Sequence, residues 1–212
     1  GDTVDRIPEA LLYQASLHMD GRELALHVPE IGAYAFAGGG VSIGRLELGR
    51  EVSVFAESYY SSSSSHYWKQ FSGADIGTLC LYAVDLEMEH RAGENLTNDI
   101  YAPFEGAKIG IFEIGAEVTA IPEYLLCQAD MSMDELEIHV PVVGAYAFAS
   151  ENISIGTLMV GKEVEKFEED YYSSSSAHYW RQFAGVTVGT LRLSATSLVT
   201  VHTEGEGLTN NI

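Results

Sequence analysis

The sequence has 212 residues, carries 31 acidic against 11 basic side chains, and has a formal net charge of −20. Such a charge repels the phosphates of nucleic acids and of anionic membranes, which are bound through clustered lysine and arginine, and it favours cations or a basic protein partner. No apolar run reaches the length of about 18 residues that spans a bilayer, so no membrane span is expected.

The chain is a tandem duplication with an offset of 112 residues. Residues 49–71 return at 161–183 with 16 of 23 positions identical, and shorter segments recur at the same offset. A period this long predicts two small domains, because solenoids are built from units of about 20 to 50 residues. We therefore expect one domain over residues 1–105 and a second, homologous one over residues 106–212.

Alternating apolar and polar residues predict β-strands along the chain, for example at 23–28, 84–90 and 135–140. Residues 9–19 and 123–133 fit a short helix as well. A form that reads apolar–Gly–x–apolar–x–apolar occurs at 43–48, 76–81, 109–114, 155–160 and 188–193. Each occurrence predicts a strand between glycine turns, so each domain is expected to repeat a four-stranded motif. The predicted fold class is all-β, with two tandem Greek-key β-sandwich domains.

The stretch from 155 to 172 resembles the join between two Greek-key motifs of the βγ-crystallins. That family has an apolar–Ser–Ser–apolar–x–Val segment, a glycine, an alternating strand and an aromatic–Glu hairpin. Residues 155–160 match the first part and 167–168 match the hairpin, whereas 156–157 read Gly-Thr where the family has paired serines. A serine run also replaces the glycine that follows the hairpin aromatic. The resemblance implies the Greek-key fold and a non-enzymatic, structural role.

The same resemblance implies a calcium site, because some βγ-crystallins bind this ion, which takes about six to eight oxygen ligands. Carried over, the loop ligand is Asn152, the hairpin ligand is Glu168, and Asp75 is a further candidate oxygen donor. The first copy has Gly40 and Ala56 at the places of Asn152 and Glu168, so the site is incomplete there. The alternative interpretation is that these are ordinary turn residues.

An aromatic and serine-rich segment in each copy indicates a second function. Aromatic faces flanked by hydroxyls suit a sugar-binding groove, and this reading predicts a lectin-like or adhesive extracellular binding module. The alternative is that the rings fill the core while the serines form the tip of a hairpin. The candidate binding residues are Tyr59, Tyr60, His66, Trp68, Tyr171, Tyr172, His178 and Trp180.

Motifs of catalysis are absent from the sequence, which has no Gly-x-Ser-x-Gly elbow, no phosphate loop and no dinucleotide fingerprint. We therefore expect no enzyme and no cofactor beyond calcium. Two cysteines are too few for a disulfide framework. Glycosylation triplets at 95–97 and 152–154 favour an extracellular location. The expected partners are cations, glycans, a basic protein or a second copy of the chain.

Overall fold

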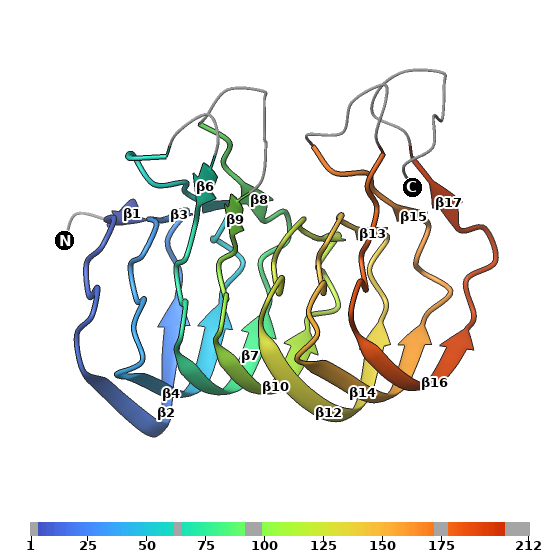
Figure 1. Cartoon of the computed structure of the whole chain (residues 1–212), viewed down its shortest axis with the longest axis horizontal. Helices are drawn as coiled ribbons and strands as arrows, with labels where there is room; N and C mark the ends of the chain where they lie inside the picture. Colours follow the sequence, from blue (N-terminus) through green and yellow to red (C-terminus); the bar gives the residue numbers. More distant parts are fainter. Residues whose placement is uncertain (1–3, 62–64, 92–98, 172–177, 202–212) are drawn as a thin grey trace.

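The computed structural model describes residues 4–61, 65–91, 99–171 and 178–201, and these form strands and turns without a helix (Figure 1). Every strand pairing is parallel. Because parallel neighbours that follow each other in sequence require the chain to travel back between them, the chain winds as a solenoid. We call one turn of this solenoid a coil. Within the described residues, no helix is long and apolar enough to cross a membrane.

Seven long strands form one sheet along the solenoid, in the order β16-β14-β12-β10-β7-β4-β2. Each coil contributes one of these strands. Their bounds are β2 (Leu17–Leu26), β4 (Val41–Leu48), β7 (Asp75–Leu81), β10 (Lys108–Ile114), β12 (Asp130–Ile138), β14 (Ile153–Val160) and β16 (Thr187–Leu193).

Short strands form the opposite side of the solenoid, in two separate sheets of four (Figure 1). The first sheet holds β1 (Arg6–Ile7), β3 (Glu30–Ile31), β5 (Val54–Phe55) and β8 (Glu87–Met88). The second holds β11 (Ala120–Ile121), β13 (Val142–Val143), β15 (Lys166–Phe167) and β17 (Val199–Thr200). A further pair consists of β6 (Ser65–Tyr67) and β9 (Asp99–Tyr101). The short sheets are interrupted between β8 and β11, whereas the long sheet continues through the same coils.

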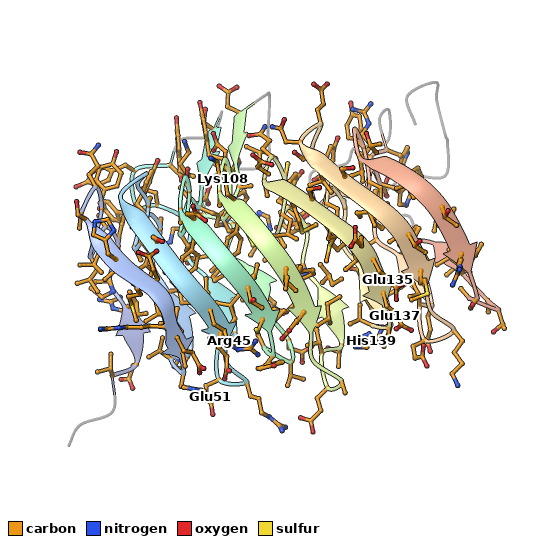
Figure 2. All side chains as sticks on the ribbon, turned by 90° about the horizontal axis from the view of Figure 1, so that it is seen from below. Arg45, Glu51, Lys108, Glu135, Glu137 and His139 are labelled. Atoms are coloured by element: carbon orange, nitrogen blue, oxygen red, sulfur yellow. The ribbon has the colours of Figure 1, made fainter. Side chains whose placement is uncertain are left out.

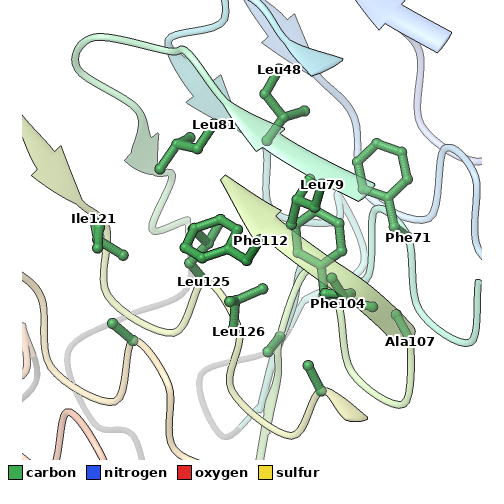
Figure 3. Packing of buried hydrophobic residues seen from close by; sticks show 14 of the residues in the cluster. Leu48, Phe71, Leu79, Leu81, Phe104, Ala107, Phe112, Ile121, Leu125 and Leu126 are labelled. Carbon is green, nitrogen blue, oxygen red and sulfur yellow. The ribbon is translucent and has the colours of Figure 1, made fainter. Parts of the chain in front are cut away.

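A single hydrophobic core runs along the inside of the coils. In the internal coils the three apolar positions of the repeated form point into it, as in β7, where Ile76, Leu79 and Leu81 have no exposed surface, whereas Leu191 and Leu193 of β16 are exposed. In the turn segments that join short to long strands, phenylalanines stack from coil to coil, and the rings of Phe71 and Phe104 lie 5.0 Å apart (Figure 3). Each side chain buried in this way contributes about 1.5–3 kcal/mol to stability.

The glycine of the repeated form lies inside the strand and against the backbone of the preceding coil, which for Gly77, Gly110 and Gly189 is the glycine of that coil. A Cβ atom on Gly77 would lie 2.6 Å from the carbonyl oxygen of Gly44, and one on Gly110 would lie 2.6 Å from that of Gly77. The strands predicted from this form are confirmed, but the glycines serve close backbone approach within the sheet, so their placement in turns is wrong.

The outer face of the long sheet is polar, and Glu135 and Glu137 project from β12 on this side (Figure 2). The Arg45 guanidinium lies 3.1 Å from the carboxylate of Glu113 and donates a hydrogen bond of 2.9 Å to the Tyr82 hydroxyl. Part of the chain's excess negative charge is therefore spread along a flat sheet surface.

The parallel pairing shows that the predicted Greek-key β-sandwich is wrong, because a Greek key consists of antiparallel neighbours. The five glycine-containing strands are the long strands of separate coils, not members of a four-stranded motif. The repeating unit is thus one coil of a solenoid. The 112-residue period of the duplication predicted two domains instead of a solenoid, and this prediction of the repeat type is wrong. The short helices considered for residues 9–19 and 123–133 do not form: residues 9–14 and 123–128 are turns, and 17–19 and 130–133 already belong to β2 and β12. The long sheet and the core both continue across the expected boundary between residues 105 and 106.

Candidate binding groove

The two aromatic and serine-rich segments are insertions that follow β5 and β15, and each is fixed at its base by a tryptophan and a glutamine. The indole N–H of Trp68 donates to the carbonyl of Glu89 at 2.9 Å. The side-chain amide of Gln70 donates to the carbonyl of Ala56 at 2.8 Å. The second copy makes comparable bonds with Trp180 and Gln182. These shared residues therefore hold each insertion to the solenoid.

A buried carboxylate–imidazole pair lies inside each insertion. Nδ1 of His66 contacts Glu57, and Nδ1 of His178 contacts Glu169, with all four side chains at most 1% exposed. Each pair places opposite charges or a strong hydrogen bond where an isolated charge would be costly. The ring of His66 also stacks on Trp68, at 5.8 Å between centroids. The candidates His66, Trp68 and His178 are thus interior residues.

Other candidates from the same segments lie at the surface. Tyr59, Tyr60 and Tyr171 are 74%, 83% and 58% exposed. Trp180 is partly buried, and Tyr172 lies outside the described residues. The structure therefore divides the predicted set into rings that fill the interior and tyrosines that solvent reaches.

His90 and Glu123 join the two copies at the interruption of the short sheets. Nε2 of His90 lies 2.6 Å from a carboxylate oxygen of Glu123, and the His90 ring stacks on Tyr171 at 4.2 Å. The same carboxylate group accepts a hydrogen bond of 3.2 Å from the backbone amide of Tyr171. One glutamate thus positions both a histidine that follows β8 and the exposed tyrosine of the second insertion.

A groove with a volume of about 500 Å³ lies beside this cluster, between β8 and β11. Its apolar part includes Leu86, Met88, Ile121 and Pro122. No lysine or arginine is found among the described residues that line it. The carboxylates that line it are those of Asp85, Glu87, Glu123, Glu168 and Glu169.

No family model, characterised protein or solved structure matches this chain.

Besides Glu123, two of the groove carboxylates have basic partners that the structure places beside them. Glu168 lies 2.7 Å from the ammonium group of Lys166, and Glu169 is paired with His178. Asp85 accepts a hydrogen bond of 2.6 Å from the hydroxyl of Thr119. The groove therefore has a negative field even when these neighbours are counted.

Tyr124 follows the groove residue Glu123 in the sequence and is a buried, neutral hydrogen-bond donor. Its hydroxyl donates to the carboxylate of Asp170, and its ring stacks against Trp68 at 6.0 Å between centroids. Burial, together with the negative charge of Asp170, raises the pKa of Tyr124 well above 10. The phenol consequently keeps its proton near neutral pH and links the second insertion to the core of the first.

The three residues of the expected calcium site do not meet. Asp75 begins β7 and Asn152 precedes β14, with β10 and β12 between these strands in the sheet. Glu168 follows β15 on the side of the short strands. Across residues 4–61, 65–91, 99–171 and 178–201, no three His, Cys, Asp or Glu side chains are grouped to hold a metal ion. Calcium binding by the protein stays a prediction, without these three residues as a common site.

Of the groove residues, the sequence pointed to Glu168 and Tyr171, though for other ligands. The buried acid–imidazole pairs of the insertions left a further signal. Glu57 and Glu169 occupy identical positions in the repeated segments, as do His66 and His178. Such matched acid–imidazole positions indicate pairing. His90 and Glu123 gave no comparable signal, because they come from different coils and meet only through the winding of the chain.

Proposed function

We propose that this protein is a non-enzymatic binding module whose groove between β8 and β11 takes a basic peptide segment of a partner protein. The observation that carries the proposal is the set of carboxylates that solvent reaches around an apolar floor, those of Asp85, Glu87, Glu123 and Glu168, with no lysine or arginine among the described lining residues. Lysine and arginine suit such a site because their aliphatic stems pack on apolar surface while their charged ends reach acids. An exposed ring such as Tyr171 adds a cation–π contact.

The charge of the whole chain supports the same ligand chemistry. A net charge of −20 attracts a basic segment from a distance and raises the rate of encounter, an effect that salt screens. The imidazoles of His66 and His178 are at most 1% exposed, so a groove ligand would not reach them. This burial supports binding rather than catalysis as the role of the insertions.

The residues of the glycosylation triplet at 152–154 support an extracellular setting for this binding. Asn152 and Ser154 are both exposed, so this triplet is open to modification. We therefore propose an extracellular location for the protein.

A labelled lysine-rich peptide tests the proposal by fluorescence anisotropy at low and high salt. The double variant Asp85→Asn, Glu87→Gln removes two groove charges, and we expect its affinity to fall by more than about fivefold. The double variant Glu151→Gln, Glu163→Gln is the matched control, because it removes the same charge from exposed sites outside the groove. Equal losses in the two variants would show that only net charge attracts the peptide and would sink the groove as its site.

A glycan is the second candidate ligand, and the first insertion favours it. Tyr59 and Tyr60 are the most exposed rings of the described residues, and they lie edge to face at 5.5 Å. A glycan array read with the wild-type protein and with Tyr59→Ser, Tyr60→Ser separates the two ligand classes. Sugars lost only in the variant would identify a glycan site, whereas an unchanged array would leave these tyrosines without this role.

A further inference from the structure

The short sheets part between β8 and β11 because a proline occupies the position of a backbone donor. At the other junctions between short strands, the backbone N–H that follows one strand donates to the last carbonyl of the strand before it. Six such bonds, of 2.8–3.1 Å, occur among the described residues, and the accepting carbonyls are those of Ile7, Ile31, Phe55, Ile121, Val143 and Phe167. At the seventh junction the donor position is Pro122, which has no N–H. The carbonyl of Met88 therefore lacks the donor that its six equivalents have.

The Met88 carbonyl faces the groove between β8 and β11. In a strand, the backbone groups of successive residues point to opposite neighbours. The amides of Glu87 and Glu89 donate to the β5 side, so the backbone of Met88, which lies between them, points toward β11. Met88 and Pro122 both line the groove. The groove thus contains a backbone acceptor in addition to its carboxylates.

The gap between the two strands suits the end of a side chain better than a whole strand. Before the gap, the backbone amide of Thr119 donates to the carbonyl of Val84 at 3.0 Å. After it, the ring of His90 lies 2.6 Å from the carboxylate of Glu123. An added strand passing between β8 and β11 would break both contacts, whereas a long side chain enters from solvent without breaking either.

We propose that the groove selects the unmodified ammonium group of a lysine, which donates an N–H to the Met88 carbonyl while carboxylates balance its charge. The inference rests on the proposed function, because it names the group of the basic peptide that the groove recognises. An ammonium group has three donors and no acceptor, so it suits a place where a carbonyl and carboxylates lie together. The nearest carboxylates in the sequence are those of Glu87, beside Met88, and Glu123, beside Pro122.

Trimethyllysine distinguishes this inference from simple attraction by charge. It keeps the positive charge and the alkyl stem of lysine but has no N–H to donate. Attraction by charge, with a cation–π contact to Tyr171, would bind it at least as well as lysine. Recognition through the Met88 carbonyl would not, because methyl groups would replace a charged donor at a polar acceptor.

The test compares a labelled lysine-rich peptide with the same peptide trimethylated at every lysine, by fluorescence anisotropy at one ionic strength. With the wild type, we expect the trimethylated peptide to bind more than about tenfold more weakly. Pro122→Ala supplies an N–H for the Met88 carbonyl, so in this variant the lysine peptide should bind more weakly and its advantage should fall below about threefold. Pro8→Ala, at the equivalent proline of the first copy and outside this groove, is the matched control and should keep the wild-type preference.

Equal affinities of the wild type for the two peptides would overturn the inference, and this comparison needs no folded variant. A preference that Pro122→Ala leaves unchanged would also overturn it, because the bulk of the methyl groups would then explain the difference. If only methylation of the peptide's backbone amides weakens binding, the donor is the peptide backbone and the inference is wrong. None of these results would contradict the proposed function, which fails instead if the groove variant and its control lose affinity equally.

Discussion

Replacing Gly77 by alanine should destabilise the protein through a clash inside the long sheet. The new Cβ would lie 2.6 Å from the carbonyl oxygen of Gly44, about 0.8 Å closer than the 3.4 Å at which ordinary contact begins. Strands in a sheet are held about 4.8 Å apart by hydrogen bonds, and β7 is held on both sides, by β4 and by β10. Neither neighbour can move away without breaking its own ladder.

The magnitude follows from two opposing effects. Forcing an extra methyl group into a packed site costs about 1–3 kcal/mol. The loss of glycine's freedom in the unfolded chain returns about 0.4–1 kcal/mol. A net loss of about 1–2 kcal/mol is expected, and for a chain of this size it lowers the unfolding temperature by about 2–8 °C.

Thermal unfolding followed by circular dichroism measures this loss, with Gly39→Ala as the matched control. A Cβ on Gly39 meets no atom within 4 Å, and its φ angle is not in the left-handed region, so that variant should unfold at or slightly above the wild-type temperature. Gly110→Ala should behave like Gly77→Ala, because its clash distance is the same. If Gly77→Ala were as harmless as Gly39→Ala, the stacked-glycine account of the sheet would be wrong.

Three further predictions concern titration, reactivity and calcium. Because the folded-state pKa of Tyr124 lies above 10, the contribution of this residue to stability is complete below pH 10 and is lost as the pH rises beyond it. The urea midpoint of the wild type should therefore fall more steeply with pH above 10 than that of Tyr124→Phe, and equal slopes in the two proteins would contradict this. Burial raises the pKa of Cys80 and of Cys127 to about 12, so both thiols should react with a thiol reagent near neutral pH only after the protein is denatured. Rapid labelling of either thiol in the native protein would contradict this prediction. Asp75, Asn152 and Glu168 do not meet, so replacing all three should leave any calcium-induced shift of the unfolding temperature unchanged. Loss of such a shift in the triple variant would show that these residues do bind calcium.

The sequence predicted the elements of the fold better than their arrangement. The duplication and the five glycine-containing strands were readable, and those strands are β4, β7, β10, β14 and β16. Their pairing was not readable, because side chains alternate between two faces in parallel and antiparallel strands alike. The glycine inside each strand was the one sequence feature that indicated how the strands pair. Its recurrence at one position of the strand reflects stacking on the neighbouring coil, which a hairpin would not require.

The sequence left the aromatic and serine-rich segments open between a binding groove and core packing, for a similar reason. Their near identity in the two copies suggested a surface site, yet Trp68, His66 and Gln70 are shared because they hold each insertion to its coil. Tyr59 and Tyr60 are shared as well but are exposed. Repetition within one chain therefore does not separate interior residues from surface ones. Hydrogen-bonding capacity does so better, since a buried Trp or Gln must find a partner.

The groove lies where the first copy meets the second, between β8 and β11. Glu9 and Glu123 are equivalent, and each accepts a bond from the backbone amide of an exposed tyrosine. Of these two glutamates, Glu123 contacts His90, because the residues that follow β8 lie next to the turn that follows β11. A duplicated chain thus has two similar insertions but, in its described residues, one junction where the short sheets part. Glu123 lines the groove and Glu9 does not, so substituting Glu9 should leave peptide binding unchanged, whereas substituting Glu123 should weaken it.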